Sequence, residues 1–261
     1  RILCSPYYIL AKKSMRNASC ISSMSYDFLV WARNFSNSRI SEFDKVVNFT
    51  WPVKLLTDSE LSSARLWWSQ NGILENDKFR IIFVGSFSRA FDFNVIFEAA
   101  KELSNQNVNC EFVLCGNGEF YKDLDERAQN SSNVKIIGWI DQSKIIALGE
   151  MSSVYIAPYK NRSDFIMSIP NKIVDSLRLA LPLICPLKGE VNALININNI
   201  GFYYNDASSL SNSIMTLVND SNLQKKMSNN AKNLHNNKFE FHNVYGGLVN
   251  HLENMLNSDL S

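Results

Sequence analysis

From Phe79 onward, short apolar runs alternate with amphipathic stretches, and this alternation limits the possible folds more than any other feature. The apolar runs predict strands at Phe79–Val84, Glu111–Cys115, Val134–Ile137, Val154–Pro158, Leu183–Cys185 and Ile200–Tyr204. The stretches between them predict helices at Asn94–Leu103, Phe120–Ala128, Gln142–Met151 and Pro170–Ala180. Strands that are apolar on both faces and separated by helices are typical of a parallel sheet covered on both sides. We therefore expect an α/β fold with a Rossmann-like, doubly wound parallel sheet.

The residues before this alternation read as the tail end of a preceding domain. A strand, a helix and a second strand are predicted at Ala18–Met24, Tyr26–Phe35 and Lys45–Phe49. Trp51 and Pro52 then mark a turn into a connector, which holds a helical stretch at Asp58–Ser69. We place a domain boundary near residue 52, so that residues 1–52 form the end of one domain plus the hinge and residues 53–261 form the next.

Charge and cysteine content exclude several classes of function. The 26 basic and 25 acidic residues leave a net charge of +1, which argues against a nucleic-acid binder. No apolar run approaches the roughly 20 residues of a transmembrane helix. The cysteines have no zinc-ligand spacing, so we expect no metal and read them as reduced, buried thiols of a cytoplasmic protein. They are Cys4, Cys20, Cys110, Cys115 and Cys185.

The stretch from Ser168 to Asp175 is the most informative for chemistry. Pro170 suits the first turn of a helix, with Ser168 as its cap, and the amides of such a turn favour anions. Asn171 and Asp175 share one helix face, with Lys172 beside them. A cation at the helix start suits a diphosphate, and a carboxylate one turn later suits a ribose diol. On spacing alone, an ordinary surface helix with a solvated Lys/Asp pair remains the alternative.

Six short motifs follow the predicted strands in order. They are Phe83-Val-Gly-Ser86, Leu114-Cys-Gly-Asn-Gly118, Ile137-Gly-Trp139, Ala157-Pro-Tyr159, Ile169-Pro-Asn-Lys172 and Lys188-Gly-Glu190. Together they resemble the C-terminal, donor-binding domain of retaining family-4 glycosyltransferases with the GT-B fold, over about Phe79–Val218. The similarity is greatest to members that build bacterial surface polysaccharides such as capsule and lipopolysaccharide. Residues 1–52 then resemble the end of the N-terminal, acceptor-binding domain, and the last helices resemble those that cross back to it.

The resemblance implies transfer of a sugar, with its configuration retained, from a UDP- or GDP-linked donor. The expected acceptor is a glycan or a lipid-linked glycan, and neither a cofactor nor a metal is expected. The family acts at the cytoplasmic face of the inner membrane, with any peripheral membrane contact made by the other domain. Because the general base usually comes from that domain, we expect this chain alone to bind donor without turnover.

The resemblance also assigns roles to individual positions. Lys172 and Arg89 are the candidate catalytic residues, since each would stabilise charge on the leaving phosphate. Asp175 would hold the ribose, and Trp139 would line the base slot unless it packs in the core. The other expected donor-binding residues are Gly85, Ser86, Gly116, Gly118, Asn171, Gly189 and Glu190.

Several positions depart from the family pattern. Many members carry Arg and Lys where this chain has Ser86 and Phe91, and an acidic residue where it has Met167. These departures support an alternative, a non-catalytic module that binds a nucleotide sugar or a partner. An epimerase on the same fold would need a His and acidic cluster in the strand-end loops. A nicotinamide site is disfavoured because Tyr121 replaces the third Gly of its motif.

Overall fold

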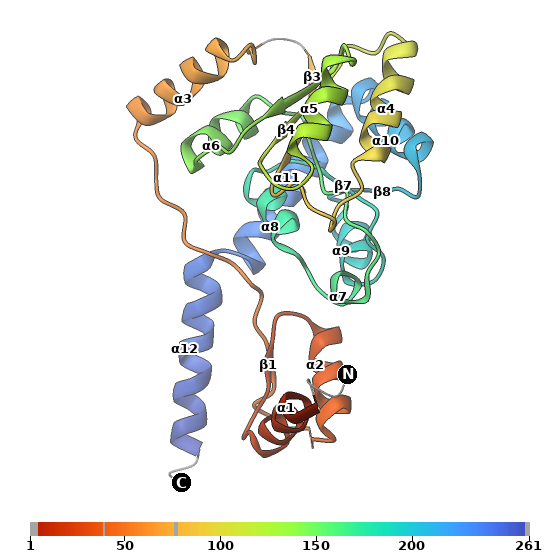
Figure 1. Cartoon of the computed structure of the whole chain (residues 1–261). Coiled ribbons are helices and arrows are strands. Elements are labelled where there is room, and N and C mark those ends of the chain that lie inside the picture. Colours follow the sequence, from red (N-terminus) through yellow and green to blue (C-terminus); the bar gives the residue numbers. More distant parts are fainter. Residues whose placement is uncertain (1–4, 39, 76–77, 259–261) are drawn as a thin grey trace.

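The computed structural model describes residues 5–38, 40–75 and 78–258 of this chain (Figure 1). Its main body is a six-stranded parallel sheet in the order β5-β4-β3-β6-β7-β8. The strands are β3 (Phe79–Val84), β4 (Cys110–Cys115), β5 (Val134–Ile137), β6 (Val154–Ile156), β7 (Leu183–Cys185) and β8 (Gly201–Tyr203). This is the Rossmann strand order, with its switch point between β3 and β6. The predicted α/β, doubly wound sheet is confirmed.

Helices cover both faces of this sheet. Helix α4 packs against α10, α6 packs against α3, and α8 packs against α11. Figure 1 shows the α4–α10 pair and the α3–α6 pair on opposite sides of the strands. The helices of this body are α3 (Asp58–Gln70), α4 (Asn94–Asn105), α5 (Tyr121–Gln129), α6 (Gln142–Glu150), α7 (Ser163–Ile166), α8 (Asn171–Arg178), α9 (Glu190–Asn198), α10 (Ala207–Asn219) and α11 (Ser221–Lys238).

A smaller unit precedes the main body. It contains α1 (Ser5–Asn17), β1 (Ser22–Ser23), α2 (Tyr26–Ser36) and β2 (Lys45–Val46), with β1 and β2 paired in parallel. The last helix, α12 (Phe241–Ser258), runs away from the sheet and lies beside this unit (Figure 1). Lys45 Nζ donates to the Gly247 carbonyl at 2.8 Å, and Thr50 Oγ1 donates to the Phe239 carbonyl at 2.7 Å. The hinge region is therefore in contact with the end of the chain.

The structure shortens four predicted strands, most of all the two that precede the main body, and adds three helices. The strands predicted at Ala18–Met24 and Lys45–Phe49 pair over two residues each, as β1 and β2. Helices α1, α7 and α9 were not predicted. In α9 only Val191 and Ile195 are buried, whereas Ala193 and Ile197 are apolar but exposed, so the apolar residues of its sequence do not mark one helix face.

The hydrophobic core lies between the sheet and its helices. The central strands β3, β4 and β6 are almost entirely buried on both faces, as their apolar sequences predict. Among the described residues, Cys110, Cys115 and Cys185 are buried free thiols and Cys20 is a half-buried one, while Cys4 lies outside the described residues.

Candidate functional site

The loops that follow β3, β4 and β5 meet the first turn of α8 around a cavity of about 310 Å³, here called the glycine cavity. Ligands of open parallel sheets bind at this carboxyl edge, next to the switch point. The cavity brings together residues that the sequence predicts for the site, namely Gly85, Ser86, Gly116, Trp139 and Lys172.

A second cavity, of about 510 Å³, adjoins the first and is here called the aromatic cavity. Trp139 and Lys172 line both cavities, so the two share a wall. The aromatic cavity also contains Asn171, Asp175, Arg178 and the two hinge aromatics Phe49 and Trp51. Sequence reasoning missed the last three of these residues. Phe49 and Trp51 read as part of a strand and a turn, and no local pattern shows that the hinge folds back onto α8.

Backbone contact between two loops shapes the glycine cavity. Gly85 N–H donates to the Cys115 carbonyl at 2.9 Å, and Gly116 follows with a φ of +155°. A Cβ atom on Gly116 would lie 1.8 Å from the carbonyl oxygen of Gly85. Only glycine fits this position, because any side chain would force the two loops apart.

A chain of alternating charges follows the face of α8 that borders the aromatic cavity. Lys172 Nζ lies 2.6 Å from Asp175 Oδ2, and Arg178 Nη2 lies 3.1 Å from Asp175 Oδ1. The aliphatic stem of Lys172 passes close to Gly85, with Cε 3.0 Å from where a Cβ on that glycine would lie. The guanidinium of Arg178 lies 5.2 Å from the centre of the Trp51 ring, at cation–π distance. Lys172 thus stands between the two cavities, and Arg178 joins α8 to the hinge.

Trp139 and Asp141 border both the sheet edge and α6. The Trp139 side chain is 76% exposed, so it lies at the cavity mouths and not in the core. Asp141 caps α6 by accepting a hydrogen bond from the Lys144 amide. Partial burial alone would raise the pKa of Asp141, but hydrogen bonds from Lys144 and Ser143 lower it to about 2. Asp141 is therefore a carboxylate at neutral pH.

Arg89 and Gly118 line neither cavity. The Arg89 side chain is 83% exposed and pairs with Glu119, with Nε 3.1 Å from Oε2. Gly118 packs against the Phe87 backbone, where a Cβ would lie 2.6 Å from the carbonyl oxygen. The structure thus places Lys172, and not Arg89, between the two cavities.

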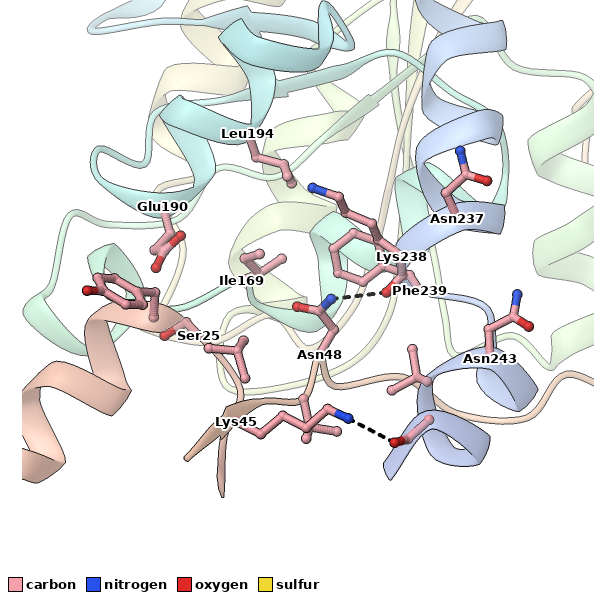
Figure 2. Close-up of a pocket in the computed structure, with 15 residues that line it drawn as sticks. Ser25, Lys45, Asn48, Ile169, Glu190, Leu194, Asn237, Lys238, Phe239 and Asn243 are labelled. Atoms are coloured by element: carbon pink, nitrogen blue, oxygen red, sulfur yellow. Dashed lines mark hydrogen bonds between the residues drawn. The ribbon is translucent and has the colours of Figure 1, made fainter. Parts of the chain in front are cut away.

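Glu190 lies in a third cavity, of about 590 Å³, here called the Glu190 cavity (Figure 2). Gly189, with a φ of +68°, ends the preceding loop, and Glu190 begins α9. Figure 2 shows Glu190 near Ser25 of the preceding unit, and Glu190 Oε1 accepts the Asp27 amide at 3.1 Å. Across this cavity, Asn48 Nδ2 donates to the Lys238 carbonyl at 3.0 Å. Among the predicted site residues, Glu190 alone lines this cavity.

The start of α8 differs from the prediction in one detail. The helix begins at Asn171 with Pro170 at the N-cap position, and among the described residues no side chain caps it. Ser168 instead donates from Oγ to the Phe165 carbonyl, because α7 ends just before it. The prediction that Ser168 caps this helix was therefore wrong. Met167 offers its backbone carbonyl to Ser25 Oγ, which links this loop to the preceding unit.

Two general properties complete the description. Within residues 5–38, 40–75 and 78–258, no group of His, Cys, Asp and Glu side chains has the makeup of a metal site. In those same ranges, no helix combines the length and apolarity that a membrane crossing demands.

Solved structures resemble this chain over nearly its whole length. HepE from Anabaena, crystallised with UDP and glucose, has 16% sequence identity and a TM-score of 0.73, covering 95% of this chain and 67% of HepE. Sucrose-phosphate synthase from Thermosynechococcus elongatus has 15% identity and a TM-score of 0.72, covering 97% and 62% respectively. WaaG, a glycosyltransferase involved in lipopolysaccharide biosynthesis, has 13% identity and a TM-score of 0.62, covering 87% and 60%. This chain therefore spans roughly two thirds of the length of these proteins, and at these identities the likeness shows the fold.

Sequence comparison identifies the family. No curated protein sequence gives a significant match. The profile of the family described as "Glycosyl transferases group 1" matches residues 68–234, which is more than half of the chain. The match runs from the end of α3 to the end of α11 and so takes in the whole six-stranded sheet. This chain belongs to the glycosyl transferases of group 1.

Proposed function

We propose that this chain is the donor-binding part of a retaining, family-4 glycosyltransferase that uses a UDP- or GDP-linked sugar. The observation that carries the proposal is the pair of adjoining cavities at the switch point of the sheet, with Lys172 in both. HepE, which shares this fold, has been crystallised with UDP and with UDP-glucose. Group 1 family membership supports glycosyl transfer as the general reaction.

The two cavities suit the two halves of a nucleotide sugar. The glycine cavity, bordered by backbone and by Lys172, suits the diphosphate and the start of the sugar. The aromatic cavity, with Trp139 at its mouth and Asp175 on its wall, suits the nucleoside. In this proposal Trp139 contacts the base, Asp175 receives the ribose hydroxyls, and Asn171 lies at the phosphate-side helix start.

The chemistry follows from that placement. In glycosyl transfer the bond between the anomeric carbon and the phosphate oxygen breaks, and a bond to the acceptor hydroxyl forms. Negative charge collects on the departing diphosphate while the sugar becomes oxocarbenium-like. The ammonium of Lys172 would stabilise that charge in the transition state. In a retaining reaction the acceptor attacks the face from which the phosphate leaves, and the acceptor proton passes to a general base that the other domain usually supplies.

The proposed biological setting rests on the resemblance to family-4 glycosyltransferases. The acceptor is a glycan or lipid-linked glycan of a surface polysaccharide, and transfer takes place at the cytoplasmic face of the inner membrane. WaaG, one of the proteins with this fold, is involved in lipopolysaccharide biosynthesis. Residues 1–52 act as the end of the acceptor-binding domain plus hinge, and residues 53–261 as the donor domain. The position of the core, which extends from Ala64 to Phe239, supports that division.

A second candidate is a non-catalytic module that binds a nucleotide sugar or a partner. Two observations favour it. Arg89 pairs with Glu119 outside both cavities, and Ser86 brings no charge to the glycine cavity. Such a module would bind the donor through Lys172 and Asp175 but would release no sugar from it.

The first test is a thermal-shift titration of the chain with UDP, GDP, CMP, ADP and dTDP. Ligand at 100 times its dissociation constant adds about 2.7 kcal/mol to the free energy of unfolding. We expect a shift with UDP or GDP that is lost in Lys172→Ala and Asp175→Ala, and kept in Lys101→Ala on α4. No shift with any nucleotide, or a shift unaffected by both site variants, would contradict the proposal.

The second test separates the two candidates. The nucleotide that binds is replaced by its glucose, galactose or N-acetylglucosamine conjugate, and a glycan acceptor is added together with an acceptor-binding domain. Transfer lost in Lys172→Ala supports the enzyme. Binding that persists without transfer to any acceptor supports the module.

A further inference from the structure

Both carboxylate oxygens of Asp175 are covered by cations. Lys172 contacts Oδ2 at 2.6 Å and Arg178 contacts Oδ1 at 3.1 Å. Only 10% of the Asp175 side chain is exposed, although the residue lines the aromatic cavity. A ribose diol that hydrogen-bonds to this carboxylate therefore competes with one of the two cations for it.

The two cations differ in how firmly they are held. The Arg178 side chain is 13% exposed, and its guanidinium lies over the Trp51 ring as well as against Asp175. A planar guanidinium held on two sides loses both contacts when it moves. Arg178 is thus the fixed partner of Asp175.

Lys172 is the more exposed of the two cations. Its side chain is 20% exposed, and its flexible stem ends in a single ammonium. It also lines the glycine cavity, so the ammonium can reach a diphosphate there by rotation of its own side chain. The Lys172 ammonium can therefore contact either of two anions, the Asp175 carboxylate or a diphosphate in the glycine cavity.

From this arrangement we infer that Lys172 is a latch that makes the site selective for nucleoside diphosphates over nucleosides. In one position the ammonium covers Asp175 Oδ2. In the other it binds a diphosphate in the glycine cavity and leaves Oδ2 free for the ribose, while Arg178 keeps Asp175 in place. A nucleoside without phosphates must break the Lys172–Asp175 pair with nothing to replace it. The inference rests on the proposed function, because it presumes that the two cavities bind one nucleotide.

The test compares dissociation constants of the wild-type chain and Lys172→Met for UDP and uridine, and for GDP and guanosine. Methionine keeps the aliphatic stem beside Gly85 and removes the charge. Loss of a hydrogen bond to a charged group should weaken the diphosphate about tenfold or more. Loss of the latch should tighten the nucleoside about twofold to fivefold, as for a partly exposed ion pair. The exposed Lys101→Met on α4 is the matched control and should change neither.

The latch is identified by opposite changes in affinity: Lys172→Met weakens diphosphate binding and tightens nucleoside binding. If Lys172→Met weakens diphosphate and nucleoside alike, or leaves the nucleoside unchanged, the latch is wrong while the nucleotide site stands. If the wild-type chain binds neither UDP nor GDP, the proposed function itself fails, and the latch with it. A second measurement uses the wild-type chain. The Lys172 side-chain ammonium NMR signal should shift when UDP or GDP binds, and a signal that stays unchanged with the nucleotide bound would overturn the inference.

Arg178 then has a separate role as a positioning residue. Arg178→Met should weaken the diphosphate and the nucleoside together, because Asp175 loses its fixed partner. The same variant should bind the 2′,3′-dideoxy diphosphate as well as the wild-type chain does, since that ligand has no ribose hydroxyls for Asp175 to receive. An equal loss with the dideoxy ligand would show that Arg178 merely supports the fold.

Discussion

At the scale of single residues, the site depends on contacts that a linear sequence shows only in part. The resemblance implies Gly116 as a donor-binding residue, and Gly116 does line the glycine cavity. Its close approach to Gly85, however, is a contact between two loops, and no local pattern encodes it. For the same reason Arg178 was overlooked, because only the fold brings Trp51 over its guanidinium.

The backbone contact at Gly116 gives the first prediction. Gly116→Ala places a Cβ 1.8 Å from the Gly85 carbonyl oxygen, so the two loops must separate. We expect the free energy of unfolding to fall by more than about 3 kcal/mol and nucleotide binding to be lost. Gly138→Ala is the matched control, because no atom lies within 4 Å of its added Cβ. Urea denaturation checks both variants, and equal stability of the two would show that the loops are not in contact.

At the scale of secondary structure, apolar runs predict where the strands lie but not which residues of neighbouring strands pair. The strands β3 and β4 each contain one charged residue within their buried core, Arg80 and Glu111. The strand register places these two residues opposite each other, and Arg80 Nε donates to Glu111 Oε1 at 2.8 Å. Lys78 and Lys135 lie within 4 Å of the same carboxylate. Sequence periodicity gives each strand but not this register, which is set by the partner strand.

The buried pair gives the second prediction. Arg80→Met leaves Glu111 in the sheet without its main counter-charge, and we expect a loss of about 3–5 kcal/mol in the free energy of unfolding. The double variant Arg80→Met with Glu111→Gln should be less destabilised than the single one, because it removes the uncompensated charge. Chemical denaturation of the wild-type chain, the two single variants and the double variant checks this. Additive losses would mean that the two side chains do not interact.

The start of α6 gives a prediction about pH. Asp141 has a folded-state pKa of about 2, below the usual unfolded value of about 3.9. Its charged form therefore stabilises the fold above pH 4, and this contribution is lost as the pH falls toward 2. Asp141→Asn keeps a capping side chain and removes the charge. Because the side chain is 41% exposed, we expect a deficit below about 1 kcal/mol at pH 7 that closes between pH 4 and pH 2. A deficit that grows on acidification would contradict this account.

At the scale of the whole molecule, the fold could be predicted largely from sequence, and the site partly. The order of strands and helices gave the doubly wound sheet, because each buried strand carries its own apolar signal. The position of the hinge could not be predicted in this way. Phe49 and Trp51 approach α8 only because the neighbouring Thr50 contacts Phe239 and Tyr245 near the end of the chain. Glu190 was grouped with the donor site, but it lies in a separate cavity against the preceding unit (Figure 2). The hinge packs against the end of the chain, and it lies between the Glu190 cavity and the aromatic cavity.

The most direct test of the account is amide chemical-shift mapping of the whole chain by NMR during titration with UDP and, in parallel, GDP. The account predicts that one of them shifts amides around the glycine and aromatic cavities, above all Gly85, Gly116, Trp139 and Asn171. Amides around Asn48 and Asn243 in the Glu190 cavity should stay unchanged. Shifts confined to the Glu190 cavity, or no shifts with either nucleotide, would contradict the claim that these two cavities form the nucleotide site.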